Sequence, residues 1–120
     1  MARILIIEDE DLVREMLEQM LERAGHEVLQ ASDGEEGVEV YRRDQPDLVI
    51  TDIQMPKKDG LDTIRDLKSD SPDLKLIAIT GFNPETLEVA RKMGIRHTYT
   101  KPFRMEELLG AVEELLGAGE

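Results

Sequence analysis

The sequence predicts a single α/β domain in which a parallel sheet is covered by helices on both faces. Short apolar runs and amphipathic helical stretches alternate five times along its 120 residues. This alternation is typical of parallel strands joined by right-handed helical crossovers. No linker or repeat interrupts the pattern, and one domain spanning residues 1–120 can bury about two-thirds of its unfolded surface.

Apolar runs that are too short for helices mark the strands. Residues 48–52 are mostly aliphatic and lie between two prolines, at positions 46 and 56, which predicts a strand buried on both faces. The other predicted strands are residues 4–7, 28–31, 74–80 and 95–100.

Helical periodicity fills the intervals between these strands. Residues 12–24 carry a stripe that we expect to face the core, and Gly25 can end this helix. The stripe consists of Leu12, Val13, Met16, Leu17, Met20, Leu21 and Ala24. Asp33 can cap the second helix. Further helices are predicted over residues 60–70, 84–93 and 105–116.

Composition excludes several classes of function. The net charge of −12 argues against direct binding to nucleic acid or to an anionic membrane, which would repel the chain. With no cysteine and two histidines, a zinc site lacks ligands, so any metal should be a hard, oxygen-bound ion. No apolar run resembles a signal peptide or a membrane span, and we expect a cytoplasmic protein.

Functional side chains stand where four of the predicted strands end. These are Glu8 and Asp9, Asp52, Thr80 and Lys101. In parallel sheets the carboxyl ends of the strands border the ligand crevice, so these groups should converge. Carboxylates held together repel one another unless cations neutralise them, which Lys101 and a Mg²⁺ ion could do. Such a site suits phosphoryl transfer, with Asp52 as the nucleophile.

These motifs and their separations resemble the receiver domain of two-component response regulators along the whole chain. The resemblance is carried by Glu8-Asp9, by residues 52–60 (Asp-Ile-Gln-Met-Pro-Lys-Lys-Asp-Gly), by Thr80-Gly81 and by Lys101-Pro102-Phe103. It implies the flavodoxin-like receiver fold, with sheet order 2-1-3-4-5.

The resemblance also implies a function as a phosphorylation-activated signalling switch. Asp52 would be phosphorylated by a sensor histidine kinase or a histidine phosphotransfer protein, and Thr80 and Lys101 would contact the phosphoryl group. Output to a downstream protein would use the face of helix 4, strand 5 and helix 5. The chain would catalyse its own phosphorylation and dephosphorylation without being a metabolic enzyme.

The cofactor implied by the resemblance is Mg²⁺. Its ligands would be Glu8 or Asp9, Asp52 and the backbone carbonyl of Gln54. The resemblance further implies a cis peptide bond between Lys101 and Pro102.

The chain departs from the family pattern at three places. Glu8 replaces a frequent aspartate. Thr98 stands where an aromatic switch residue is usual, and Tyr99, one place later, should point to the opposite face of the strand. Phe82 is bulky for its position, and we expect it to be the aromatic group that moves with Thr80 when the chain switches.

Two functions of other classes compete with this interpretation but each lacks a feature that it needs, and one question about the signalling interpretation stays open. A flavodoxin-like electron carrier would need a first loop that receives phosphate, and residues 8–11 are all acidic. A Mg²⁺-dependent phosphatase would need an acid-base carboxylate where Gln54 stands. Within the signalling interpretation, the chain is either a free-standing receiver or a module excised from a longer regulator.

Overall fold

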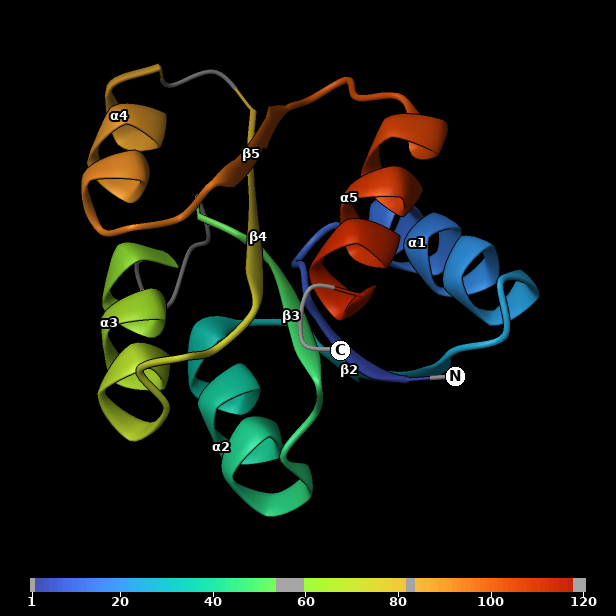
Figure 1. Ribbon diagram of the computed structural model, residues 1–120, viewed down its shortest axis with the longest axis horizontal. Helices are drawn as coiled ribbons and strands as arrows, with labels where there is room; N and C mark the ends of the chain where they lie inside the picture. Colours follow the sequence, from blue (N-terminus) through green and yellow to red (C-terminus); the bar gives the residue numbers. More distant parts are fainter. Residues whose placement is uncertain (1, 54–59, 82–83, 118–120) are drawn as a thin grey trace.

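Five parallel strands form one sheet in the order β2-β1-β3-β4-β5, as the resemblance implies (Figure 1). A computed structural model describes residues 2–53, 60–81 and 84–117. The strands are β1 (Arg3–Ile7), β2 (Glu27–Ala31), β3 (Leu48–Asp52), β4 (Leu76–Thr80) and β5 (His97–Thr100).

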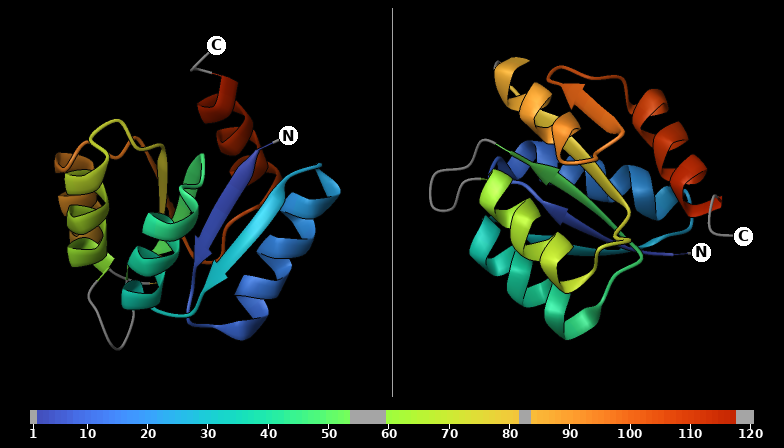
Figure 2. Two further views of the ribbon diagram at one scale, coloured as in Figure 1. Left: turned by 90° about the horizontal axis from the view of Figure 1, so that it is seen from below. Right: turned by 60° about the vertical axis from the view of Figure 1, so that its left-hand side comes forward.

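Helices cover both faces of this sheet (Figure 2). They are α1 (Asp11–Arg23), α2 (Gly34–Asp44), α3 (Gly60–Asp70), α4 (Pro84–Lys92) and α5 (Met105–Gly117). α1 and α5 pack on one face, and α2, α3 and α4 pack on the other. The predicted α/β architecture is therefore confirmed.

Strand alternation divides the core into two apolar clusters. In β1, Leu5 and Ile7 face the layer of α2, α3 and α4, whereas Ile4 and Ile6 face α1 and α5. Every residue of β3 and β4 is buried, because both strands lie inside the sheet with helices above and below them. Burial on both faces explains why these strands are continuous apolar runs.

Two predicted strands begin later than their apolar runs. The backbone N–H of Leu74 donates to Ser71 O, and that of Ile95 donates to Ala90 O. Both groups close turns after helices and are not available to the sheet ladder. Leu74 is thus partly buried before β4 begins, and Ile95 is buried before β5 begins.

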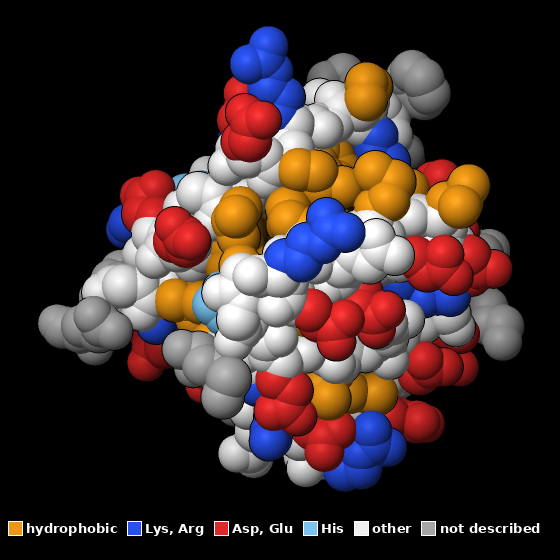
Figure 3. Space-filling model, turned by 90° about the vertical axis from the view of Figure 1, so that its right-hand side faces the viewer, with side chains coloured by type: hydrophobic (Ala, Val, Ile, Leu, Met, Phe, Trp, Pro, Cys, Tyr) orange, Lys and Arg blue, Asp and Glu red, His pale blue; other side chains and the backbone are white. Residues whose placement is uncertain are grey.

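The apolar stripe of α1 is wider than the surface that it buries. Leu17 and Leu21 are fully buried, but Leu12 is 75% exposed and Met16 is 52% exposed. The prediction that the whole stripe faces the core is wrong for these two residues and for Ala24, which is also exposed. Adjacent positions of a helix are about 100° apart, so a stripe two residues wide turns one edge towards solvent. Figure 3 shows apolar side chains gathered on this face of the molecule.

Helix ends follow the signals in the sequence. Asp33 caps α2 by accepting a hydrogen bond from Glu36 N at 2.9 Å, and Glu36 in turn accepts one from Ser32 N. Gly25 adopts φ +94° just after α1. No helix among the described residues is long and apolar enough to cross a membrane.

The packing of α2 on β1 depends on the missing side chain of Gly37. A Cβ atom there would lie 2.4 Å from Ile7 Cδ1 and 2.8 Å from Ile7 Cγ1. We expect Gly37→Ala to lower the free energy of unfolding by about 1–2 kcal/mol, because overpacking outweighs the gain in helix propensity. Urea unfolding would measure this loss.

Gly110 in α5 provides the matched control. A Cβ atom at Gly110 would meet nothing within 4 Å, so Gly110→Ala should raise the free energy of unfolding by about 0.5–1 kcal/mol. Equal or greater stability of Gly37→Ala would contradict this account of the contact between α2 and β1.

Candidate functional site

The predicted site residues lie at the carboxyl ends of the parallel strands. Asp52 is the last residue of β3 and Thr80 the last of β4, while Glu8 and Lys101 directly follow β1 and β5. Because the chain leaves β1 for the sheet edge at β2 and returns to β3, the crevice opens between β1 and β3. The topology therefore brings together groups that are far apart in sequence.

Lys101 joins three carboxylates in this crevice. Its Nζ atom lies 2.8 Å from Asp52 Oδ2, 2.8 Å from Glu10 Oε1 and 2.9 Å from Glu8 Oε1. The ammonium donates hydrogen bonds to Asp52 and Glu10. Its contact with Glu8 is an ion pair alone, so Glu8 Oε1 is buried without a hydrogen-bond partner among the described residues. The side chains of Glu8 and Asp52 are only 1% and 3% exposed.

Glu10 is the contact that sequence reasoning missed. Its backbone N–H donates to Glu8 Oε2 at 3.0 Å, which folds the loop after β1 over the crevice. The only signal in the sequence was the length of the acidic run from Glu8 to Asp11. Asp9 is partly exposed and is not one of the three carboxylates on Lys101. Its predicted role as a metal ligand stays a prediction.

Burial and ion pairing compete in the electrostatics of the site, and burial prevails at Glu8 whereas ion pairing prevails at Lys101. Removal from water raises the pKa of Glu8 from 4.5 to about 7; contacts with Lys101 and the Glu10 backbone oppose this rise, and the charge of Asp52 adds to it. Burial alone would lower the pKa of Lys101, but its contacts with Asp52, Glu10 and Glu8 outweigh that effect and raise it. Lys101 is therefore a permanent cation within an acidic crevice.

The donor set fits a hard divalent cation. Glu8, Glu10 and Asp52 each offer a carboxylate oxygen, and these atoms all lie within 4.8 Å of one another. Among the described residues, these three carboxylates face one ammonium and leave a surplus of negative charge, and oxygen ligands of this kind suit Mg²⁺. The predicted ligand Gln54 lies outside the described residues.

Thr80 brings a buried hydroxyl to the carboxyl end of β4. Its Oγ1 atom has no hydrogen-bond partner among the described residues. Its backbone oxygen accepts a hydrogen bond from Lys101 N at 2.8 Å, which ties the end of β4 to the lysine. The peptide bond between Lys101 and Pro102 is cis, as predicted.

Comparison with known proteins assigns this arrangement to a family. A family model described as the response regulator receiver domain matches residues 4–113. The chain belongs to this family. The receiver domain resemblance seen in the sequence is therefore confirmed.

Curated relatives of this receiver domain are about twice as long. Response regulator MprA of Mycolicibacterium vanbaalenii is 37% identical over 127 residues, covering 99% of this chain and 55% of the relative. Transcriptional regulatory protein PdtaR of Mycobacterium tuberculosis is 39% identical over 113 residues, covering 92% of this chain and 55% of the relative. The chain thus spans about half the length of these relatives.

Solved structures share the fold along nearly the whole receiver domain. A receiver domain protein from Clostridium thermocellum has a TM-score of 0.93 and 32% identity, covering 99% of this chain and 97% of that chain. TrrA from Thermotoga maritima, solved in complex with Mg²⁺ and BeF, has a TM-score of 0.87 and 31% identity, covering 96% of this chain and 99% of that chain.

The predicted switch residues lie on opposite faces of β5. Thr98 Oγ1 accepts a hydrogen bond from Arg91 Nε of α4 at 3.3 Å. Tyr99 packs with the cluster of α1 and α5, and its hydroxyl lies 3.5 Å from Glu107 O. The expectation that Tyr99 points away from Thr98 agrees with this arrangement. Phe82 lies outside the described residues, and the switching roles stay predictions.

An apolar groove adjoins Lys101 between α1 and α5. It has a volume of about 590 Å³, and its lining includes Val13, Met16, Phe103 and Met105. A second groove, also bordered by Met16 and Met105, continues along the same two helices. These grooves lie on the apolar face seen in Figure 3. A partner that reaches the crevice can therefore bury apolar surface beside it.

The raised pKa of Glu8 predicts a pH-dependent stability. Unfolded Glu8 ionises near 4.5 and folded Glu8 near 7, so the folded receiver domain holds the extra proton between these values. Stability associated with Glu8 therefore falls as the pH rises through this window. In EDTA at pH 8 we expect the Tm of Glu8→Gln to exceed that of the wild type by about 4 °C or more, with a smaller difference at pH 5.

Exposed Glu15 of α1 provides the control for this experiment. Glu15→Gln should shift the Tm equally at both pH values, and calorimetry can compare all three proteins. A Glu8→Gln variant whose Tm difference from the wild type is the same at pH 5 and pH 8 would rule out burial of an ionising Glu8.

Proposed function

We propose that this chain is a signalling switch that accepts a phosphoryl group on Asp52 from a phosphohistidine donor in a divalent-cation-dependent reaction. The contact of 2.8 Å between Lys101 Nζ and Asp52 Oδ2 carries the proposal. It holds a cation on the one carboxylate that ends the central strand in a buried, acidic crevice. Phosphoryl transfer depends mainly on such positioning and charge neutralisation.

The proposed reaction exchanges one bond to phosphorus for another. A carboxylate oxygen of Asp52 attacks the phosphorus atom, the P–N bond to the donor imidazole breaks, and the imidazole leaves with a proton. The product is an acyl phosphate. Hydrolysis of this acyl phosphate by water returns Asp52 and inorganic phosphate, so the chain promotes its own phosphorylation and dephosphorylation and acts as a switch.

Lys101 and Thr80 have complementary tasks in this reaction. Lys101 already contacts Asp52 and can balance the charge of the added phosphoryl oxygens. The buried Thr80 hydroxyl, which lacks a partner among the described residues, can donate to one of those oxygens. Its movement towards the phosphoryl group would pull on β4 and on the connection that follows it. This movement is the proposed start of the switch.

A bound Mg²⁺ ion would neutralise negative charge on the incoming phosphoryl group. Glu8 and Asp52 would hold it, with Glu10, Asp9 or the backbone carbonyl of Gln54 completing the protein ligands. The cluster of three carboxylates supports this assignment, as does the Mg²⁺ and BeF complex of the related TrrA.

The donor is proposed to be a sensor histidine kinase or a histidine phosphotransfer protein. The donor histidine must enter the crevice beside the apolar groove lined by Val13, Met16, Phe103 and Met105. The position of this groove supports docking of the donor over α1 and the start of α5. A downstream protein would bind the face of α4, β5 and α5. The net charge of −12 argues against direct nucleic-acid binding by this chain.

Two settings for the switch remain candidates. The chain can act as a free-standing receiver, or it can be the receiver module of a longer regulator. The length of MprA and PdtaR, of which the chain spans 55%, favours the second setting.

Replacement of Asp52 tests the phosphorylation proposal. With acetyl phosphate and Mg²⁺, the wild type should gain the mass of one phosphoryl group, and Asp52→Asn should gain none, because the amide is a poor nucleophile. Intact-protein mass spectrometry would measure both. Asp73→Asn, at an exposed carboxylate outside the crevice, should behave like the wild type. Stoichiometric phosphorylation of Asp52→Asn would overturn the assignment.

Replacement of Met16 separates donor docking from chemistry. Met16→Lys places a charge in the apolar groove beside the crevice, so phosphotransfer from the kinase that phosphorylates the wild type fastest should slow about tenfold or more. Phosphorylation by acetyl phosphate, which needs no docking surface, should be unchanged. Val89→Lys alters an exposed apolar residue of α4 and should leave both rates unchanged. An equal slowing in the two variants would exclude the groove as the docking site.

A further inference from the structure

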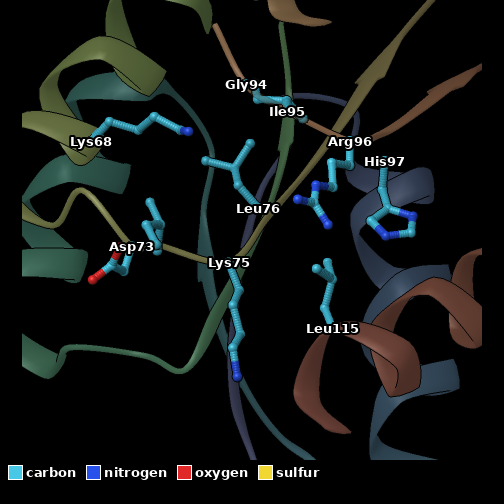
Figure 4. A pocket seen from close by; sticks show the side chains of 10 residues that line it. Lys68, Asp73, Lys75, Leu76, Gly94, Ile95, Arg96, His97 and Leu115 are labelled. Carbon is cyan, nitrogen blue, oxygen red and sulfur yellow. The ribbon is translucent and has the colours of Figure 1, made fainter. Parts of the chain in front are cut away.

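A basic cavity lies at the amino-terminal ends of β4 and β5, whereas Asp52 lies at the carboxyl end of β3. It has a volume of about 240 Å³ and is enclosed by the end of α3, the start of β4, the turn from α4 to β5 and the last turns of α5 (Figure 4). Lys68, Lys75, Arg96 and His97 line it together with one carboxylate, that of Asp73. β4 and β5 run from this cavity to Thr80 and Lys101 at their carboxyl ends.

These cations are unusual in so acidic a chain. The sequence has 27 acidic and 15 basic residues, and several arginines pair with nearby carboxylates, such as Arg42 with Asp70 at 2.7 Å. Lys68, Lys75 and Arg96 form no ion pair within the described part of the chain. Like charges that form no ion pair repel one another, so an anion bound between them would stabilise them.

The two cations nearest the centre point towards each other. Figure 4 shows the side chains of Lys68 and Arg96 approaching Leu76 from opposite sides, with the Asp73 carboxylate and the Lys75 ammonium directed away. Lys68 Nζ donates to Met93 O at 3.3 Å, which anchors the ammonium at the end of α4. Lys68 is therefore positioned before any ligand arrives and still has protons to donate.

The floor of the cavity is apolar. Leu76 and Ile95 are both buried, Leu76 lies between the two cations in Figure 4, and Leu115 of α5 lines another side. The volume equals that of about eight water molecules and lies below the range of drug-sized ligands. A ligand with one anionic group and an apolar body of about one ring would match this volume.

We propose that this cavity is a second ligand site, which binds a small organic anion with its phosphate or carboxylate group between Lys68 and Arg96 and its apolar part on Leu76 and Ile95. The site is separate from the phosphorylation crevice, because the two lie at opposite ends of β4 and β5. Its existence does not depend on the phosphorylation of Asp52, and the two proposals fail independently.

Amide NMR titration in EDTA tests the site, with phenyl phosphate, benzoate, inorganic phosphate and phenol as probes. Phenyl phosphate or benzoate should give saturable shifts at the amides of Leu76, Gly94 and Ile95. The tighter of the two identifies the preferred anionic group. Phenol, which lacks the charge, and inorganic phosphate, which lacks the ring, should each bind at least about tenfold more weakly.

Variants of the two cations complete the test. Lys68→Gln and Arg96→Gln should each weaken binding of the better probe about tenfold, because each removes a charged hydrogen-bond donor. Lys92→Gln, at an exposed α4 cation outside the lining, should bind it as the wild type does. All three should gain a phosphoryl group from acetyl phosphate as the wild type does, which shows that the fold and the crevice are intact.

Several results would overturn the proposal. Shifts that never saturate, or that appear only at the Asp52 edge, would show that the cavity binds no anion. If Lys92→Gln weakened binding of the better probe as much as Lys68→Gln and Arg96→Gln do, the effect would reflect the net charge of the protein and not a site in the cavity. Binding of inorganic phosphate as tight as that of phenyl phosphate would exclude the organic class of ligand.

Discussion

The attraction between one lysine and a set of buried carboxylates is the interaction on which the site depends. Glu8 and Asp52 are almost completely removed from water, and without Lys101 their mutual repulsion would oppose folding of the crevice. Lys101 in turn keeps its charge because these groups surround it. Within the described part of the chain, the resting site is therefore an acidic pocket that holds the Lys101 ammonium, and both an added divalent ion and an added phosphoryl group would change its charge balance. The proposed switch begins from this balance.

The topology of the sheet explains why these groups meet. Parallel strands end at the same edge, and the order β2-β1-β3-β4-β5 sets β1 beside β3, so that Glu8 and Asp52 lie across one crevice. Lys101 reaches them from the edge strand β5, and the backbone bond from Lys101 N to Thr80 O joins the last two strand ends. A movement of Thr80 would therefore displace the ends of β4 and β5. β5 belongs to the proposed output face, and both strands begin at the basic cavity.

Most of the fold and the centre of the site could be predicted from the sequence, because they follow from period and order. Apolar runs identified every strand, and the strand ends identified Asp52, Thr80 and Lys101. Glu10 was missed because an exposed side chain on a loop is placed by the path of that loop, which no periodicity records. Leu12 and Met16 were predicted to lie in the core because the helical period alone does not show which side of a wide apolar stripe is exposed to solvent. The cavity between Lys68 and Arg96 could not be predicted either, because it forms where the end of α3 lies beside the turn from α4 to β5.

The most direct test of the central claim is to locate the phosphoryl group chemically. After brief incubation with acetyl phosphate and Mg²⁺, borohydride reduces an aspartyl phosphate to homoserine, and peptide sequencing by mass spectrometry identifies its position. We expect homoserine at position 52 alone, with its yield strongly reduced in Lys101→Met. Homoserine at position 9 or 11, or an unmodified residue 52 in a protein that has gained phosphoryl mass, would contradict phosphorylation of Asp52.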